Sequence, residues 1–217
     1  MLRRSDGGLG AAVAAPLEPA LANLGMPVPD SAFAAQGRAL PLEAEPAFLV
    51  NHSVRAYAWA VGLAEHDGLA FDPEILYVSA LPHDIGLVPA YDAGGCFELD
   101  GAEVARRFAL DHDQDGARAG AIHDAIALHM AVELPPEPAP EIPLLWDSTG
   151  VDVTGYRLAD VPGRLVAPVL VAYPRLGFKR DFAAAFRDQA RRKPTCRVAA
   201  MVAAGALDRI AAAPFES

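Results

Sequence analysis

Residues 79–86 read SALPHDIG and place a histidine beside an aspartate, directly after a proline, in an otherwise apolar stretch. A buried charged side chain is costly unless it is paired or binds a metal ion. His83 and Asp84 therefore mark either an exposed helix end or a metal site. The segments around them have to distinguish these two interpretations.

The flanking segments predict helices. Residues 46–68, PAFLVNHSVRAYAWAVGLAEHDG, begin with a proline suited to a first turn and repeat apolar residues at helical spacing up to a glycine. Residues 72–86 offer Asp72 as N-cap, Pro73 at the first helical position and Gly86 as a stop. We expect this second helix to carry the histidine and aspartate pair, with a kink caused by the proline before it.

Further helical blocks follow, separated by Gly, Pro and Asp. Asp100 and Glu103 have the spacing of a capping pair, and residues 117–130 form another helical block. A proline-rich connector at residues 135–143 precedes the C-terminal half. No stretch alternates apolar and polar residues in the way that a sheet requires. The fold class expected is therefore all-α.

The length of 217 residues fits one domain with a short appendage. We expect a partly irregular N-terminal segment over residues 1–40 and a compact helical domain over residues 41–217. The formal net charge of −10 argues against a nucleic-acid or anionic membrane partner, because both favour clustered Lys and Arg. No apolar run approaches the roughly 18 residues of a membrane-spanning helix.

The two cysteines, Cys96 and Cys196, lie far apart in the sequence and form no C-x-x-C motif. This pattern predicts neither a disulfide framework nor a zinc site built from thiolates. It is typical of a reducing compartment, and we expect the protein in the cytoplasm.

Three ordered motifs carry a family resemblance. NHSVRAYAW with His52, ALPHDIG with His83 and Asp84, and VDVTG with Asp152 resemble the H…HD…D pattern of the HD-domain metal-dependent hydrolases. The segments FELDGAEVARRF, AIALH and YPRLGF are similar, more narrowly, to the cyanamide hydratase-like branch. The resemblance covers about residues 45–195 and implies a compact helical bundle.

The resemblance implies that His52, His83, Asp84 and Asp152 bind one divalent transition metal, with Zn²⁺ favoured over Fe²⁺. Imidazole nitrogens and carboxylate oxygens are suitable ligands for either ion. Such ligands, spread over separate helices, converge only in a tertiary structure, so metal binding should also stabilise the bundle. Asp84 is also the expected catalytic group, because a carboxylate near activated water can carry its proton.

Two further residues are candidates for substrate binding or for support of the ligands. Asn51 precedes the first motif histidine, and His129 lies on an apolar helix stripe that should face inward. For His129, packing as an ordinary core histidine is an equal alternative. A second histidine and aspartate pair, His123 and Asp124, has no motif around it, and we expect it at the surface or in helix packing.

The expected activity is addition of metal-activated water to a small substrate, cyanamide or a similar nitrile in first place. One alternative is a phosphohydrolase acting on a nucleotide or another phosphomonoester. Leu87 stands where many phosphate-cleaving relatives carry a basic residue, which favours a neutral substrate. A second alternative is a metal-bound binding protein without activity. The partners expected are a small molecule and no nucleic acid or membrane, and a homo-oligomer is left open.

Overall fold

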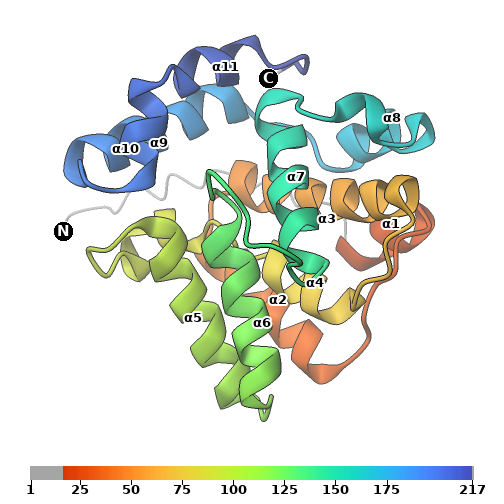
Figure 1. The fold of residues 1–217 in the computed structure, drawn as a ribbon. Helices are drawn as coiled ribbons and strands as arrows, with labels where there is room; N and C mark the ends of the chain where they lie inside the picture. The colour runs from red at the N-terminus through yellow and green to blue at the C-terminus, as the bar shows by residue number, and fades with distance from the viewer. Residues whose placement is uncertain (1–16, 217) are drawn as a thin grey trace, which may run out of the picture.

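The computed structural model describes residues 17–216. This part of the chain forms eleven α-helices and three short 3-10 helices and contains no strand, which confirms the all-α prediction (Figure 1). In chain order the elements are α1 (Leu17–Asn23), α2 (Ala32–Ala44), α3 (Ala47–Asp67), α4 (Pro73–Ala80), η1 (Ile85–Leu87), η2 (Pro89–Tyr91), α5 (Phe97–Asp111), α6 (Gly116–Leu128), α7 (Glu141–Thr154), η3 (Leu158–Asp160), α8 (Gly163–Ala172), α9 (Phe178–Arg192), α10 (Arg197–Ala203) and α11 (Ala206–Ala212).

Helices α3 and α7 pack against each other in the middle of the molecule, with α4, α5 and α6 on one side and α8 to α11 on the other (Figure 1). Helix α3 is buried over 15 of its 21 residues, because its small and apolar side chains let neighbours approach from all sides. It starts after Pro46 and ends at Gly68, which has the left-handed backbone of a helix terminus, as the sequence predicts.

Helix α4 begins as predicted but ends earlier. The Asp72 side chain accepts hydrogen bonds from the backbone N–H groups of residues 74 and 75. The helix ends at Ala80, so the histidine and aspartate pair lies in the turn that follows and not inside the helix. The expectation of a helix through residue 86 is therefore wrong. Pro82 lacks the N–H group that would continue the hydrogen-bond ladder, and this accounts for the early end.

Gly86 lets the turn after α4 approach α5. A Cβ atom at this position would lie 2.1 Å from the carbonyl oxygen of Phe97, a distance that no side chain can occupy. Glycine therefore permits a backbone contact that presses the turn against the start of α5. This contact holds the turn that carries the histidine and aspartate pair.

The expected capping pair of α5 is wrong. The helix begins at Phe97, three residues before Asp100. The Asp100 carboxylate accepts hydrogen bonds from the N–H groups of Ala93 and Gly95 in the preceding loop, and Glu103 binds two arginines of its own helix. Asp100 and Glu103 therefore do not cap the helix. Asp100 stabilises the preceding loop, and Glu103 forms ion pairs on the helix surface.

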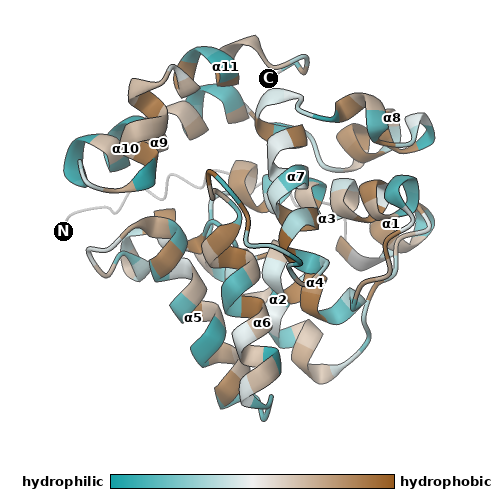
Figure 2. Ribbon diagram, in the orientation of Figure 1, coloured by the Kyte–Doolittle hydropathy of each residue, from teal (hydrophilic) through white to brown (hydrophobic). Residues whose placement is uncertain are grey.

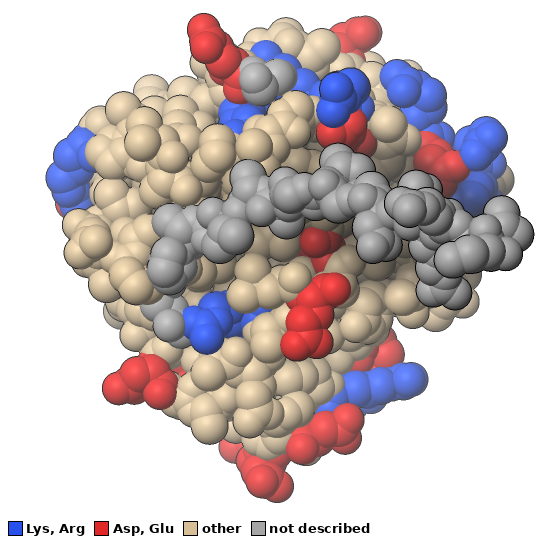
Figure 3. All heavy atoms as spheres, turned by 180° about the vertical axis from the view of Figure 1, so that it is seen from behind, with Lys and Arg blue, Asp and Glu red and all other residues tan. Residues whose placement is uncertain are grey.

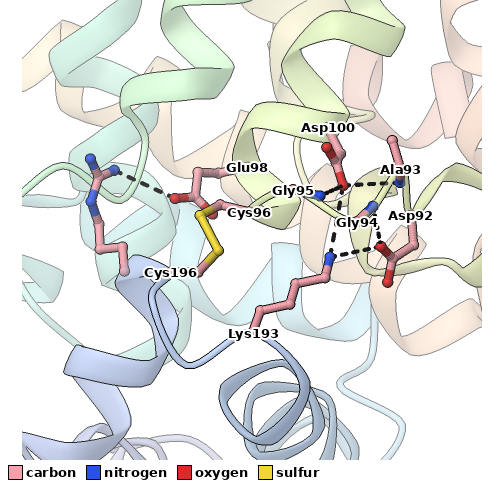
Figure 4. The surroundings of a disulfide bond; sticks show 10 residues. Asp92, Ala93, Gly94, Gly95, Cys96, Glu98, Asp100, Lys193 and Cys196 are labelled. Carbon is pink, nitrogen blue, oxygen red and sulfur yellow. Dashed lines mark hydrogen bonds and ion pairs between the residues drawn. A yellow bond between two sulfur atoms is a disulfide. The ribbon is translucent and has the colours of Figure 1, made fainter.

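The two cysteines form a disulfide, with their Cα atoms 5.3 Å apart (Figure 4). The expectation that the cysteines form no disulfide framework is wrong, and the inference of a reducing cytoplasm loses its basis with it. Cys96 precedes α5 and Cys196 precedes α10, so chain folding brings two helix starts together across 100 residues. The Lys193 ammonium, 2.8 Å from the Asp92 carboxylate, holds the same two segments together.

Helix α9 covers the core with one face. Phe178, Phe182, Phe186 and Gln189 recur at helical spacing and are buried, while its arginines point outward. Figure 2 shows this alternation as hydrophobic and hydrophilic segments along the helix. The three phenylalanine rings form a continuous row, with centroids 4.6 Å and 4.4 Å apart.

The N-terminal boundary stays a prediction. Residues 1–16, which belong to the N-terminal segment expected over 1–40, lie outside the described residues. Helix α2 crosses position 40, and its Phe33 and Ala34 are buried in the main core. Of the helices in the described part of the chain, none combines the length and apolar character that crossing a membrane requires.

Candidate metal centre

Three side chains converge at the centre of the fold. His52 comes from the first half of α3, and His83 and Asp84 come from the turn after α4. The His52 Nε2 and His83 Nε2 atoms are 3.2 Å apart, and they lie 3.5 Å and 3.4 Å from Asp84 Oδ2. All three side chains are at most 1% exposed. This triangle of one oxygen and two nitrogens is the potential metal-ligand group in the described residues.

The triangle has the dimensions of a tetrahedral ion site. Ligand atoms about 2.0 to 2.2 Å from a tetrahedral ion lie about 3.3 to 3.6 Å from one another. Two of the three separations, 3.4 and 3.5 Å, fall within that range, and the third, 3.2 Å, is just below it. The residues present therefore fit a transition-metal ion that takes two imidazoles and a carboxylate.

Hydrogen bonds on the far side of each ring orient the two histidines. His52 Nδ1 donates to Asp152 Oδ2 and His83 Nδ1 donates to the Ala80 carbonyl, each at 2.8 Å. In the neutral rings both Nε2 atoms are therefore unprotonated and carry lone pairs. Asp84 Oδ2 is buried without a hydrogen-bond partner. Three electron-rich atoms thus face one another, an arrangement that a cation would stabilise.

The charges of the group support the same conclusion. Although burial opposes ionisation, the adjacent His83 lowers the pKa of Asp84 to about 2, so Asp84 is a carboxylate. Burial also opposes a charge on His83, but Asp84 outweighs it and raises the pKa of His83 above 6.5. Burial lowers the pKa of His52. In the absence of an ion a proton on His83 balances the carboxylate, and an ion has to displace that proton.

Asp152 lies behind His52 and outside the ligand group. Its Oδ1 accepts from Arg55 Nε at 2.8 Å and Trp59 Nε1 at 3.0 Å, and its Oδ2 accepts from Arg55 Nη2 at 2.7 Å and from His52. Each oxygen already has two donors, which fill its lone pairs. The expected direct metal ligation by Asp152 therefore does not match the structure. Asp152 instead fixes the ring orientation of His52.

Arg55 belongs to the site, although the sequence motifs did not predict it. Its guanidinium is fully buried and makes a two-point contact with Asp152, while Nη1 donates to the Tyr173 carbonyl at 3.0 Å. The signal was present, because an arginine one turn after His52 inside a long apolar run must find a buried partner. Even with the large burial cost, Arg55 holds the pKa of Asp152 well below its usual range.

Asn51 and His129 take different places. Asn51 Nδ2 donates to the Pro174 carbonyl at 2.8 Å, so this side chain joins α3 to the segment before α9 and does not line the pocket. His129 follows α6, is 4% exposed and lines the pocket, with its Nε2 3.7 Å from Asp84 Oδ1. Its Nδ1 donates to the Ile126 carbonyl, and burial lowers its pKa to about 4, so it is neutral.

A pocket of about 390 Å³ opens from the ligand group. Besides the three ligands and His129, apolar side chains of α7, α9 and α10 form most of its wall. The lining residues of the described part are His52, His83, Asp84, His129, Met130, Ala131, Trp146, Thr149, Gly150, Val153, Thr154, Tyr156, Phe182, Phe186, Met201 and Arg209. The group is therefore accessible to a small molecule although it is deeply buried.

Comparison with known proteins supports the broad resemblance. Residues 49–145 match the family model described as HD domain, a range that includes the three ligands and His129. No curated protein matches the chain. The narrower similarity to the cyanamide hydratase-like branch stays a prediction. HD domains are generally metal-dependent hydrolases. Residues 49–145 of this 217-residue chain thus resemble an HD domain.

Proposed function

We propose that this chain is a single-metal enzyme that adds water to a nitrile, R–C≡N, and yields the amide. One observation carries the proposal: a buried group of two imidazoles and one carboxylate, with the spacing of ion ligands, opens into an apolar pocket. We propose His52, His83 and Asp84 as the ligands and Zn²⁺, in preference to Fe²⁺, as the ion. When bound, such an ion lowers the pKa of water toward about 7 and makes it a nucleophile at neutral pH.

Asp84 and the neighbouring His129 are the groups that we assign to proton transfer and hydrogen bonding during the reaction. Water attack on the nitrile carbon forms a C–O bond, breaks one C–N π bond and requires that protons move from oxygen to nitrogen. Asp84 Oδ1, the oxygen outside the ligand triangle, is 3.7 Å from His129 Nε2 at the pocket wall. We assign to Asp84 the transfer of the proton, and to the unprotonated His129 Nε2 a hydrogen bond to water or substrate.

The charge distribution favours a neutral substrate over a phosphate ester. Arg209 is the single Lys or Arg among the described residues that line the pocket, and its Nη1 is engaged by the Ala204 carbonyl. A phosphate site normally presents several cations or bidentate arginines. On the face shown in Figure 3, Lys and Arg side chains are scattered among acidic ones and form no continuous basic surface in the described residues.

The proposal is tested with protein loaded with zinc or iron. Cyanamide, other nitriles and a panel of nucleoside monophosphates are supplied separately, and amide, urea and phosphate are quantified. We expect hydration of at least one nitrile and phosphate release no faster than from the His83→Ala control. Phosphate release that depends on His83, without any amide or urea, would assign the chain to the phosphohydrolases instead.

His129→Ala separates the roles inside the pocket. We expect the variant to keep its metal but to lose most of its activity, because His129 lies outside the ligand group and lines the pocket. Loss of the metal together with activity would make His129 a ligand. A metal-loaded wild type that hydrates and cleaves nothing, yet binds a nitrile, would favour the binding protein without activity.

A further inference from the structure

The part of the pocket beyond the ligand group has its own chemical character. Trp146 and Val153 from α7, Phe182 and Phe186 from α9 and Met201 from α10 contribute apolar atoms to its wall. These residues come from three helices and from outside the two motifs that hold the ligands. The wall is therefore a separate feature that acts on the body of the substrate and not on its reacting group.

The volume of the pocket exceeds what the smallest nitriles need. At about 30 Å³ for each water molecule in the liquid, a pocket of about 390 Å³ has the volume of roughly a dozen waters. Cyanamide has three non-hydrogen atoms and would displace about two or three of them. Pockets of about 300 to 1,000 Å³ generally enclose molecules of drug size. A minimal substrate would leave most of the apolar wall in contact with water.

The wall is aromatic and adaptable. The Phe182 and Phe186 rings are 4.4 Å apart between centroids, and the Trp146 and Tyr156 rings meet edge to face at 5.7 Å. One pair lies on α9, and the other joins α7 to the turn that follows it. Such pairs suit a flat apolar group that packs against ring faces or edges. Met201 adds a flexible side chain that can adapt to the shape of a bound molecule.

We propose that the substrate of this site is a neutral molecule with an aromatic or bulky apolar body, in the range of about 10 to 15 non-hydrogen atoms. This inference rests on the proposed function, and under that function the substrate is an arylalkyl nitrile and not cyanamide. Its nitrile carbon lies at the ligand group, and its body fills the space between α7, α9 and α10. Water adds across the C≡N bond: both C–N π bonds are lost, a C–O σ bond and a C–O π bond form, and both water protons end on nitrogen in the amide.

The first test compares kcat/KM for cyanamide, acetonitrile, phenylacetonitrile and naphthylacetonitrile with the metal-loaded protein. Each buried CH₂ equivalent is worth about 0.8 kcal/mol, or about fourfold in binding, so the arylalkyl nitriles should exceed acetonitrile at least tenfold. Met201→Trp reduces the free volume and should lower the ratio of naphthylacetonitrile to acetonitrile at least tenfold. Val171→Ser, at a side chain 82% exposed on α8, is the control and should leave the ratio unchanged.

A binding experiment keeps this inference separate from the proposed function. Phenylacetamide and acetamide are titrated into the metal-loaded protein by calorimetry. Phenylacetamide that binds at least tenfold more tightly than acetamide, with the difference lost in Met201→Trp, supports an apolar substrate body even if no nitrile is hydrated. Absence of nitrile hydration would by itself overturn only the proposed reaction. Cyanamide turnover equal to or above that of the arylalkyl nitriles, or equal binding of the two amides, would overturn the substrate class.

Discussion

Two histidine and aspartate pairs occur in this chain, and only their surroundings distinguish them. His83 and Asp84 lie in a turn, are at most 1% exposed and face a third ligand from α3. His123 and Asp124 lie within α6, with side chains 33% and 60% exposed. The exposed pair satisfies itself through a 2.9 Å contact between His123 Nδ1 and Asp124 Oδ1.

The comparison shows what makes such a pair a ligand set. In the buried pair the His83 Nδ1 donates to a backbone carbonyl, which leaves Nε2 free, and Asp84 Oδ2 remains without a hydrogen-bond partner. In the exposed pair the His123 Nδ1 and the Asp124 carboxylate instead bind each other. Burial, an occupied far side of the imidazole and a third converging donor therefore give the first pair its metal-binding character.

The largest expected effect comes from removing one member of each pair. His83→Ala should reduce the metal content from about one ion per chain to almost none, because two remaining ligands hold an ion poorly. His123→Ala should keep the full content. Both variants are measured by elemental analysis after purification with added zinc. Equal loss from the two variants would erase the difference between the pairs.

Asp152 extends the comparison to the support of the ligands. Asp152→Asn should weaken metal affinity by about 10- to 100-fold, because the His52 ring loses the carboxylate that orients it. It should also destabilise the fold by about 3 to 5 kcal/mol, since Arg55 keeps a buried charge without its partner.

Asp124→Asn is the matched control, because the Asp124 carboxylate is exposed. This substitution should change the metal affinity and the free energy of unfolding little. Competition with a zinc-sensitive dye measures affinity, and urea unfolding of the metal-free protein measures stability. An unaltered affinity in Asp152→Asn would mean that the ring orientation of His52 does not depend on this carboxylate.

Removing the disulfide tests whether it contributes to the fold that buries His83 and Asp84. It joins the start of α5 to the start of α10 (Figure 4). Helix α10 also carries Met201, which lines the pocket. Cys196→Ser should lower the free energy of unfolding by about 2 to 4 kcal/mol under oxidising conditions. The metal content should be unchanged, because all ligands lie elsewhere. Wild type in reductant should match the variant, and a difference between them would assign the loss to local packing of the serine.

The smallest effect concerns pH. An ion needs His83 Nε2 without its proton, and the pKa of His83 is raised above 6.5 through Asp84. Protons therefore compete with the ion below that raised pKa, and apparent affinity should fall about tenfold per pH unit there. His52 and Asp84, whose pKa values are lowered, compete only at more acidic pH. Dye competition from pH 5.5 to 8 checks this, and His123→Ala should give the same curve. A flat curve would contradict the assigned charge on His83.

Much of this arrangement could be predicted from local sequence. The two bounds of α3, the Asp72 cap and the pairing of His52 with His83 and Asp84 follow from caps, periodicity and motif. The same signals placed the end of α4 at Gly86, but Pro82 already ends the helix at Ala80, and Gly86 instead permits a contact with α5. Capping and helix-propensity signals describe one segment and do not include its contacts with other helices.

Long-range features were the ones that sequence patterns missed. The disulfide joins residues 100 positions apart, a proximity that arises only in the folded chain. The position of Asp152 depends on Arg55 and Trp59, two residues of α3 that donate hydrogen bonds to its carboxylate. A motif identifies an acidic residue near a histidine. The number of hydrogen-bond donors around that carboxylate decides whether it binds a metal ion or accepts a hydrogen bond from the imidazole.

The most direct measurement is a crystal structure of the zinc-soaked protein with anomalous data collected above and below the zinc edge. We expect one strong anomalous peak about 2.0 to 2.2 Å from His52 Nε2, His83 Nε2 and Asp84 Oδ2, with Asp152 still bound to Arg55. We expect no peak at His123. A peak at the exposed pair, or none at the buried group in fully soaked crystals, would contradict this expectation.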